Sequence, residues 1–220
     1  MNIIITGASK GIGYETAKLL SAEHTVINIS RSAEKAGLPG VIPLAFDFET
    51  GNITKGLLPR IKEHFKTVDV LVNNAATLIR KPFEKIIQED LQKVYKVNLF
   101  SVIELTQAVL PLMNKGHVIN ISSVGGVQGS VKFPGLSAYS SSKGALITLT
   151  ECLAEEYKTK KIAFNTIAFG SVQTEMLEEA FPGFKAPISA KEAAEFLAQF
   201  AVTGHKYFNG KILQMALSTP

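Results

Sequence analysis

The sequence predicts an α/β fold: a doubly wound parallel sheet of about seven strands, with helices on both faces. The first observation is that short β-branched segments alternate with longer helical patterns along the whole chain. The second is that most of the short segments are apolar on both sides, as in parallel strands covered by helices. A regular β-then-α order favours right-handed crossovers within one sheet. Because no linker-like, repetitive or low-complexity stretch divides the 220 residues, we expect a single domain over 1–220.

The expected elements follow this alternation. The segments that predict strands are Asn2–Thr6, Thr25–Ile29, Val41–Phe46, Val68–Val72, His117–Ser122, Ile162–Ala168 and Ile212–Met215. The stretches with helical periodicity are Ile12–Ala22, Ile53–Phe65, Gln88–Met113, Ala138–Lys158 and Ala190–Ala201. Two regions are short for this architecture. Arg31–Gly40 has room for a loop and one helical turn, and Leu177–Ser189 predicts a short helix followed by an irregular loop.

Composition excludes several classes of protein. Lys and Arg total 23 against 19 Asp and Glu, but the basic residues are scattered, so no arm for nucleic acid is predicted. The single Cys152 excludes an intramolecular disulfide and agrees with a reducing compartment. The four histidines lie far apart and show no metal-ligand spacing. With neither a secretory signal nor an apolar stretch long enough for a bilayer, we expect a cytoplasmic protein with no membrane partner.

A glycine-rich loop, TGASKGIG at Thr6–Gly13, joins the first predicted strand to the first predicted helix. Ligands of open α/β sheets bind at the carboxyl ends of strands, and a pyrophosphate favours a helix N-terminus. Gly7 permits the tight turn, Gly11 lets the backbone approach the phosphates, and Gly13 allows close packing of the helix on the strand. A merely tight turn needs one glycine and not three, so the loop predicts a dinucleotide cofactor.

The spacing G-x-x-x-G-x-G in this loop is similar to that of the classical short-chain dehydrogenase/reductase family, and further motifs follow in the family's order. They are NNAA at Asn73–Ala76, Asn98 in VNLF, Ser123 in NISSVGG, YSSSK at Tyr139–Lys143 and NTIAFGSVQTEM at Asn165–Met176. The resemblance covers almost the whole chain and implies a Rossmann-type NAD(P)-binding fold. The cofactor contacts that it implies are Gly7, Ser9, Lys10, Gly11, Ile12, Gly13, Arg31, Asp47, Asn74, Ala75, Tyr139, Lys143, Gly170, Val172 and Thr174.

The second strand indicates which nicotinamide cofactor is used. It ends in Ser30 and Arg31, without the acidic residue that would accept hydrogen bonds from the 2′-hydroxyl of NAD(H). Arg31 is suited to a 2′-phosphate, and by the resemblance Lys10 in the glycine loop points the same way. We therefore expect NADP(H), with NAD(H) as the alternative, although both cations could simply be solvated. Asp47 resembles the aspartate that contacts the adenine amino group, and a turn-capping role fits it nearly as well.

The candidate catalytic residues centre on one helix. Tyr139 and Lys143 are four residues apart and project from one face, where a nearby ammonium favours the ionised phenol. By the resemblance, Tyr139 donates the proton in ketone reduction, Lys143 bonds the nicotinamide ribose, Ser123 holds the substrate oxygen, and Asn98 holds a water of the proton relay. Each has an ordinary structural alternative: a packed ring, a solvated amine, the neighbouring Ser122 in place of Ser123, or an interior amide.

Three departures from the family pattern concern the substrate. Sixteen positions separate Ser123 from Tyr139, more than the family commonly has, with Gly129–Pro134 as the expected insertion. Phe169 stands where the family usually has proline. The short segment Leu177–Ser189 predicts a small lid, in which Phe181 and Phe184 form either an apolar wall or the anchors of a loop.

The leading hypothesis is an NADP(H)-dependent oxidoreductase that interconverts a small-molecule ketone or aldehyde and an alcohol. The alternative is a non-catalytic NADP(H)-binding or sensor protein on the same fold. Sugar-nucleotide epimerases share the Tyr–Lys pair, but this chain is too short for their second region. The resemblance also implies a homodimer or homotetramer formed through Gln88–Met113 and Ala138–Lys158, unless the sheet uses the apolar faces of both helices. The tail from Phe208 to Pro220 resembles the family's last strand, which often joins a second interface.

Overall fold

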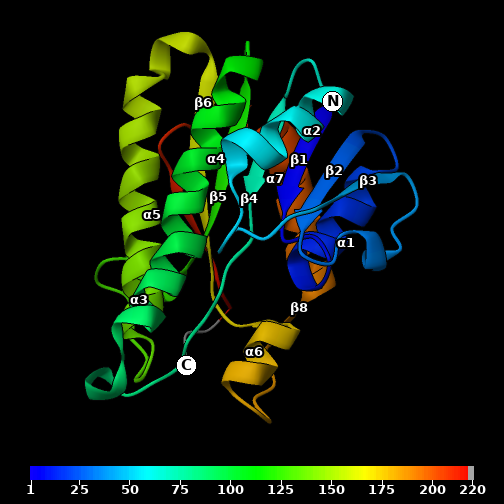
Figure 1. Cartoon of the computed structure of the whole chain (residues 1–220). Coiled ribbons are helices and arrows are strands. Elements are labelled where there is room, and N and C mark those ends of the chain that lie inside the picture. Colours follow the sequence, from blue (N-terminus) through cyan, green and yellow to red (C-terminus); the bar gives the residue numbers. More distant parts are fainter. Residues whose placement is uncertain (218–220) are drawn as a thin grey trace.

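The computed structural model describes residues 1–217 and contains a seven-stranded sheet in which every neighbouring pair is parallel (Figure 1). The strand order is β3-β2-β1-β4-β5-β6-β9. The order runs outward in both directions from β1, so the predicted doubly wound fold is confirmed. The strands are β1 (Asn2–Thr6), β2 (Thr25–Ser30), β3 (Val41–Ala45), β4 (Val70–Asn73), β5 (Gly116–Ser123), β6 (Ile162–Phe169) and β9 (Ile212–Met215).

Helices cover both faces of this sheet and enclose two apolar cores. On one face, α1 (Gly11–Leu20) and α7 (Ala190–Thr203) pack side by side, with Ala17 and Leu197 fully buried among strand residues. On the other face lie α2 (Leu58–His64), α4 (Ser101–Val109) and α5 (Ser137–Glu156). The central strands are buried from both sides, which explains their uninterrupted apolar sequences.

The predicted helical stretch over Gln88–Met113 is helical from Gln88 to Leu112, but it is not uniformly α-helical. It divides into α3 (Gln88–Tyr95), a π-helical turn over Lys96–Phe100, α4, and a 3₁₀ turn over Leu110–Leu112. The π turn contains the buried Asn98, whose side chain bonds to the backbone of a neighbouring loop, and such bulges are common at functional sites. The predicted helical stretch is therefore confirmed, and the sequence missed only the π turn at the residue that the family motif singles out.

The two short regions fit the prediction in outline. Between β2 and β3 the chain forms only a 3₁₀ turn over Glu34–Ala36. After β6 the structure adds a small parallel sheet of β7 (Val172–Gln173) and β8 (Ile188–Ser189), which the sequence did not predict.

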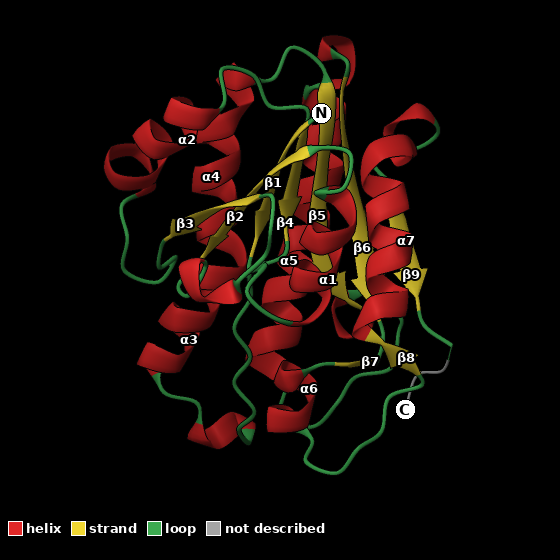
Figure 2. Cartoon of the chain, turned by 90° about the vertical axis from the view of Figure 1, so that its right-hand side faces the viewer, coloured by secondary structure: helices red, strands yellow, loops and turns green. Residues whose placement is uncertain are grey.

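Between β7 and β8 lies the short helix α6 (Glu175–Ala180). It begins two residues before the predicted position because the Thr174 hydroxyl accepts a hydrogen bond from the Leu177 amide and caps it. Both views show α6 projecting beyond the carboxyl ends of the strands, where the predicted site residues converge (Figures 1 and 2). Among the described residues, none of the helices is long and apolar enough to span a membrane.

Candidate active site

A cavity of about 590 Å³ opens at the carboxyl edge of the sheet, between the glycine loop and α6. It brings together most of the predicted site residues, although they come from distant parts of the chain. Those that line it are Gly7, Ser9, Lys10, Gly11, Ile12, Arg31, Asp47, Asn74, Ala75, Ser123, Tyr139, Lys143, Gly170, Val172 and Thr174. Gly13 and Asn98 do not line the cavity. Gly13 packs against Gly7 and Asn74, which do line it, and Asn98 bonds to Ser142 on α5.

The glycine loop is interlocked with the loop that follows β4. The Thr6 hydroxyl accepts hydrogen bonds from the amides of Asn74 and Ala75, both at 2.9 Å. Gly7 has a φ of 69°, and a Cβ there would lie 2.8 Å from the Ala75 Cα. A Cβ at Gly13 would lie 2.5 Å from the Asn74 Nδ2 atom and 2.7 Å from the Gly7 carbonyl oxygen. Gly13 therefore allows close packing, but of α1 on the glycine loop and Asn74, and not on the strand as predicted.

The N-terminus of α1 faces the cavity with its amides available. Its N-cap residue, Lys10, makes no side-chain cap hydrogen bond, and the first turn carries no acidic residue. The first four amides of a helix have no partners within the helix, and the helix dipole favours negative charge there. With the tight glycine turn, this end of α1 can hold a pyrophosphate.

The end of β2 provides a polar group and a cation. The Ser30 side chain is buried, lines the cavity, and its Oγ atom has no hydrogen-bond partner within residues 1–217. Arg31 follows it at the cavity edge. The Asp47 Oδ1 atom accepts a hydrogen bond from the Glu49 amide at 2.9 Å, which is the predicted turn-capping role, and Asp47 also lines the cavity. An unpaired buried hydroxyl beside an arginine suits a phosphorylated ribose.

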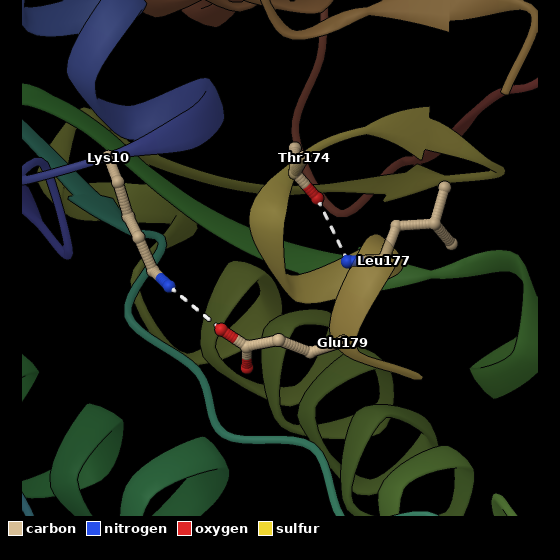
Figure 3. Close-up of polar contacts among 4 residues, drawn as sticks. All are labelled: Lys10, Thr174, Leu177 and Glu179. Atoms are coloured by element: carbon tan, nitrogen blue, oxygen red, sulfur yellow. Dashed lines mark hydrogen bonds and ion pairs between the residues drawn. The ribbon is translucent and has the colours of Figure 1, made fainter. Parts of the chain in front are cut away.

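Lys10, the second predicted cation, is already engaged by α6. Its Nζ atom lies 3.5 Å from a carboxylate oxygen of Glu179, and Figure 3 shows the two side chains reaching toward each other from the glycine loop and α6. Both side chains are more than half exposed, so the pair is weak. Figure 3 also shows the Thr174 cap, so the cofactor contact predicted for Thr174 and the start of α6 share one residue.

Tyr139 and Lys143 lie on α5, with Ser123 opposite at the end of β5. Burial raises the pKa of Tyr139 to about 12, and a hydrogen bond with the Ser123 side chain opposes that rise. Burial also lowers the pKa of Lys143 to about 7. The Lys143 Nζ atom donates to the Ile121 carbonyl at 2.8 Å and lies 5.9 Å from the centre of the Tyr139 ring. Desolvation thus outweighs the expected effect of the ammonium, and the phenol is protonated at neutral pH.

The two adjacent serines have different environments. The Ser122 hydroxyl is buried and donates to the Lys143 carbonyl at 3.0 Å, which ties β5 to α5. The Ser123 hydroxyl accepts a hydrogen bond from the Gly125 amide at 3.2 Å and interacts with Tyr139. Ser123 is therefore the serine placed beside the phenol, as the family register implied.

Asn98 is fully buried, and its side chain is bonded within the protein. Its oxygen accepts from the Thr77 amide at 2.8 Å, and its nitrogen donates to the Thr77 carbonyl and the Ser142 hydroxyl, both at 3.0 Å. This is the interior-amide arrangement that the sequence left open. Through these bonds Asn98 joins the loop after β4 to α5, three residues from Tyr139.

A family model described as short chain dehydrogenase matches residues 1–184. The chain belongs to this family. A 3-oxoacyl-acyl-carrier-protein reductase from Thermotoga maritima is 33% identical over 204 residues, covering 87% of this chain and 79% of the relative. Carbonyl reductase (NADPH) 2 from Sus scrofa is also 33% identical, over 76% of this chain and 70% of the relative. A short-chain dehydrogenase from Burkholderia cenocepacia, solved with NADP, is 26% identical with a TM-score of 0.86, covering 97% and 95% of the two chains.

In this short-chain dehydrogenase, several cavity residues were missed by the sequence reasoning. Phe133 and Leu136 come from the loop before α5, which was expected to border the substrate without these residues being named, and Leu78 comes from the loop after β4. Apolar residues in loops carry no periodic signal, so the sequence did not indicate that they meet. Ser30 could have been found, because it directly precedes Arg31 at the end of β2.

Proposed function

We propose that this short-chain dehydrogenase is an NADP(H)-dependent oxidoreductase that reduces a ketone or aldehyde to an alcohol. The observation that carries the proposal is one cavity with a dinucleotide cradle at one end and Tyr139, Ser123 and Lys143 at the other. The names of the two relatives, one an acyl-chain reductase and one an NADPH carbonyl reductase, support carbonyl reduction.

The residues present fit NADP(H). The glycine turns leave room for a pyrophosphate at α1, and the unpaired Ser30 hydroxyl with Arg31 suits a phosphorylated ribose. No acidic side chain stands at the end of β2 to select the 2′-hydroxyl of NAD(H), which stays the second choice. Ser9, Ile12, Asn74, Ala75, Gly170, Val172 and Thr174 complete the proposed contact set.

Bound NADPH supplies the hydride. The protein's own residues supply the proton and hold the substrate oxygen: Tyr139 donates its phenolic proton, and the Ser123 hydroxyl hydrogen-bonds the carbonyl oxygen as negative charge develops on it. Because burial keeps the Tyr139 phenol protonated, the site is prepared for reduction. Lys143 stands near Tyr139 and would bond the cofactor ribose, while Asn98 positions α5 relative to the loop after β4.

The test is NADPH oxidation over a broad panel of carbonyl compounds, with NADH run in parallel and Tyr139→Phe as the control. We expect turnover with NADPH to exceed that with NADH, and the variant to lose a factor of roughly 10²–10⁴ in kcat, because the proton donor is removed. The Kd for NADPH should stay within about twofold, since the ring and Lys143 remain. Turnover unchanged by Tyr139→Phe would contradict the mechanism, and tight NADPH binding without any turnover would favour the sensor alternative.

We also propose that residues 1–220 form one cytoplasmic domain that assembles as a homodimer or homotetramer. Leu91 and Phe100, on the predicted long helix, and Tyr207, before β9, are large apolar side chains that remain exposed. Residues 218–220 of the tail lie outside the described residues. Light scattering at working concentration tests the assembly, and a monomer alone would contradict it.

A further inference from the structure

The end of the cavity beyond Tyr139 is apolar. Its lining there comes from the loop after β4, the loop before α5, and α6 with the loop that follows it. The residues are Leu78, Phe133, Leu136, Leu177, Phe181 and Phe184. The charged side chains that line the cavity lie elsewhere within the described chain. Lys10, Arg31, Asp47, Glu49 and Lys93 come from the glycine loop or surround the ends of β2 and β3, Glu175 lies beside Gly11, and the Lys143 ammonium is bonded to a carbonyl.

Arg80 lies where the three segments of this apolar wall meet. Its Nη1 atom donates to the Ala180 carbonyl at 2.8 Å, and its guanidinium carbon lies 4.5 Å from the centre of the Phe181 ring. On the other side, a Cβ at Gly135 would lie 3.2 Å from the Arg80 Cγ atom, and the Lys81 amide donates to the Gly135 carbonyl at 3.0 Å. One side chain therefore contacts both the end of α6 and the loop before α5.

The contact with Ala180 has a clear electrostatic reason. Ala180 is the last residue of α6, and the final carbonyls of a helix have no partner within it. A guanidinium at that end satisfies one carbonyl and complements the negative end of the helix dipole. Its planar face also fits the Phe181 ring, an arrangement that lysine cannot reproduce as well. The cation of Arg80 is thus used to hold the wall.

We propose that Arg80 is a positioning residue that fixes Phe181 as the wall of the substrate end, and that this wall selects uncharged, apolar carbonyl compounds such as aryl alkyl ketones. The inference rests on the proposed function, since it assumes that the carbonyl group lies beside Tyr139. A carboxylate on the substrate would lose its hydration against the apolar lining without gaining a free cation, and this loss disfavours binding.

Two ketones of the same shape provide the test: 4-methylacetophenone, and 4-acetylbenzoate, which has a carboxylate in place of the methyl group. We expect the wild-type kcat/KM to favour the methyl compound by about tenfold or more, because an unpaired charge is costly to desolvate. Arg80→Gln should raise the KM for the methyl compound about fivefold and change kcat less than about twofold, since it loosens the wall and leaves Tyr139 in place. Arg60→Gln is the matched control, because Arg60 also donates to a backbone carbonyl, that of Ala45, outside the apolar wall.

A double-mutant cycle tests whether Arg80 acts through Phe181. If it does, Arg80→Gln adds little to the rise in KM that Phe181→Ala causes by itself, and the two effects are not additive. Additive effects would overturn the positioning role. A preference for 4-acetylbenzoate that Arg80→Gln abolishes would also overturn it, because Arg80 would then be an anion anchor. If the glutamine variant does not fold, Arg80→Lys keeps the charge and is expected to show a smaller rise in KM.

Ligand-observed NMR of both ketones with the NADP⁺-loaded protein separates this inference from the proposed function. Selective binding of the methyl compound, weakened by Arg80→Gln, supports the apolar wall whether or not either ketone is reduced. If that binding occurs and no compound of the broad carbonyl panel is turned over, the reductase proposal fails and the inference about the apolar wall holds. Equal binding of the two ketones, or binding of neither, would overturn the inference.

Discussion

The two ends of the cavity are built in different ways. The cofactor end is a backbone structure: Gly7 and Gly13 lie so close to Asn74 and Ala75 that a methyl group does not fit, and the Thr6 hydroxyl joins the two loops. The substrate end depends on side-chain contacts such as that of Arg80 with the Phe181 ring, and the exposed pair of Lys10 and Glu179 links α6 to the glycine loop. Close-packed backbone tolerates almost no substitution, whereas exposed side-chain contacts contribute little each and can be exchanged. We therefore expect that a single added methyl group at the cofactor end causes a large loss of stability and cofactor affinity. Single substitutions at the substrate end should change ligand affinity only slightly.

Gly13→Ala should have the largest effect. The added methyl group would meet the Asn74 amide and the Gly7 carbonyl oxygen at less than 3 Å, and the carbonyl belongs to a loop that is itself fixed. We expect a loss of about 3 kcal/mol in the free energy of unfolding and NADPH binding weakened about 100-fold or more, as for severe overpacking. Urea titration and calorimetry measure the two quantities.

Gly56→Ala is the control for that substitution. Gly56 lies in the helical segment before α2, and among residues 1–217 the nearest atom to an added Cβ, apart from its chain neighbours and its own helix backbone, is a Phe46 ring carbon at 4.0 Å. Its stability should be unchanged or slightly raised, because alanine is the better helix former by about 0.5–1 kcal/mol. If Gly13→Ala were as mild as this control, the description of the cofactor end as close-packed would be wrong.

Lys143→Met should change the free energy of unfolding less than Gly13→Ala does, and it should raise this free energy where Gly13→Ala lowers it. Lys143 is almost fully buried, and burial lowers the pKa of its ammonium to about 7 from an ordinary 10.5. The unfolded chain binds the proton more tightly between these values, so the free energy of unfolding rises with pH across this window. Methionine removes the cost of burying the charge, and we expect about 2 kcal/mol of added stability at pH 7 together with loss of activity.

Denaturant titrations between pH 7 and 9.5 test this prediction. The upper limit avoids the range in which Tyr139 matters: its raised pKa of about 12 makes stability fall as the pH rises through and above its ordinary value of 10. In wild type the unfolding free energy should rise with pH over this range, and in Lys143→Met the rise should be smaller. Equal slopes in the two proteins would show that Lys143 is charged and solvated in the folded state.

The same contrast explains what the sequence could predict. The glycine spacing, the apolar strands and the Tyr–Lys pair are local patterns with a physical cause, and the structure places them as expected. The π turn around Asn98 was missed because it depends on hydrogen bonds to the Thr77 backbone, 21 positions away. The β7–β8 pair was missed because each strand has two residues, too few for a period-two pattern.

The direction of the Tyr139 pKa shift was also beyond the sequence. Residue spacing indicates that Lys143 is near, but the balance between a nearby charge and desolvation depends on burial, which only the packed structure shows. Likewise, Arg80 follows the NNAA motif by only a few positions, yet its partners Gly135 and Ala180 come from the loop before α5 and the end of α6. Contacts made through tertiary structure by single side chains are what a pattern of residues leaves open.

Glu179→Gln should have the smallest effect and tests the exposed ion pair that links α6, at the substrate end, to the glycine loop, at the cofactor end. The variant releases Lys10 from its pairing with α6 and leaves this cation available to the 2′-phosphate of NADPH. Because both side chains are more than half exposed, the gain in NADPH affinity should not exceed about threefold, and it should shrink as salt is added. The affinity for NADH, which lacks the 2′-phosphate, should change much less.

Glu195→Gln on α7 makes the same change in net charge on an exposed residue away from the cavity, and fluorescence titration of both cofactors compares the two variants. An equal gain in both variants would mean that overall charge, and not the release of Lys10, attracts the cofactor. A gain of tenfold or more confined to Glu179→Gln would exceed what an exposed ion pair supplies by roughly a factor of three. In that case α6 would have to restrain the glycine loop through contacts beyond this pair, and the two ends of the cavity would be less independent than their construction indicates.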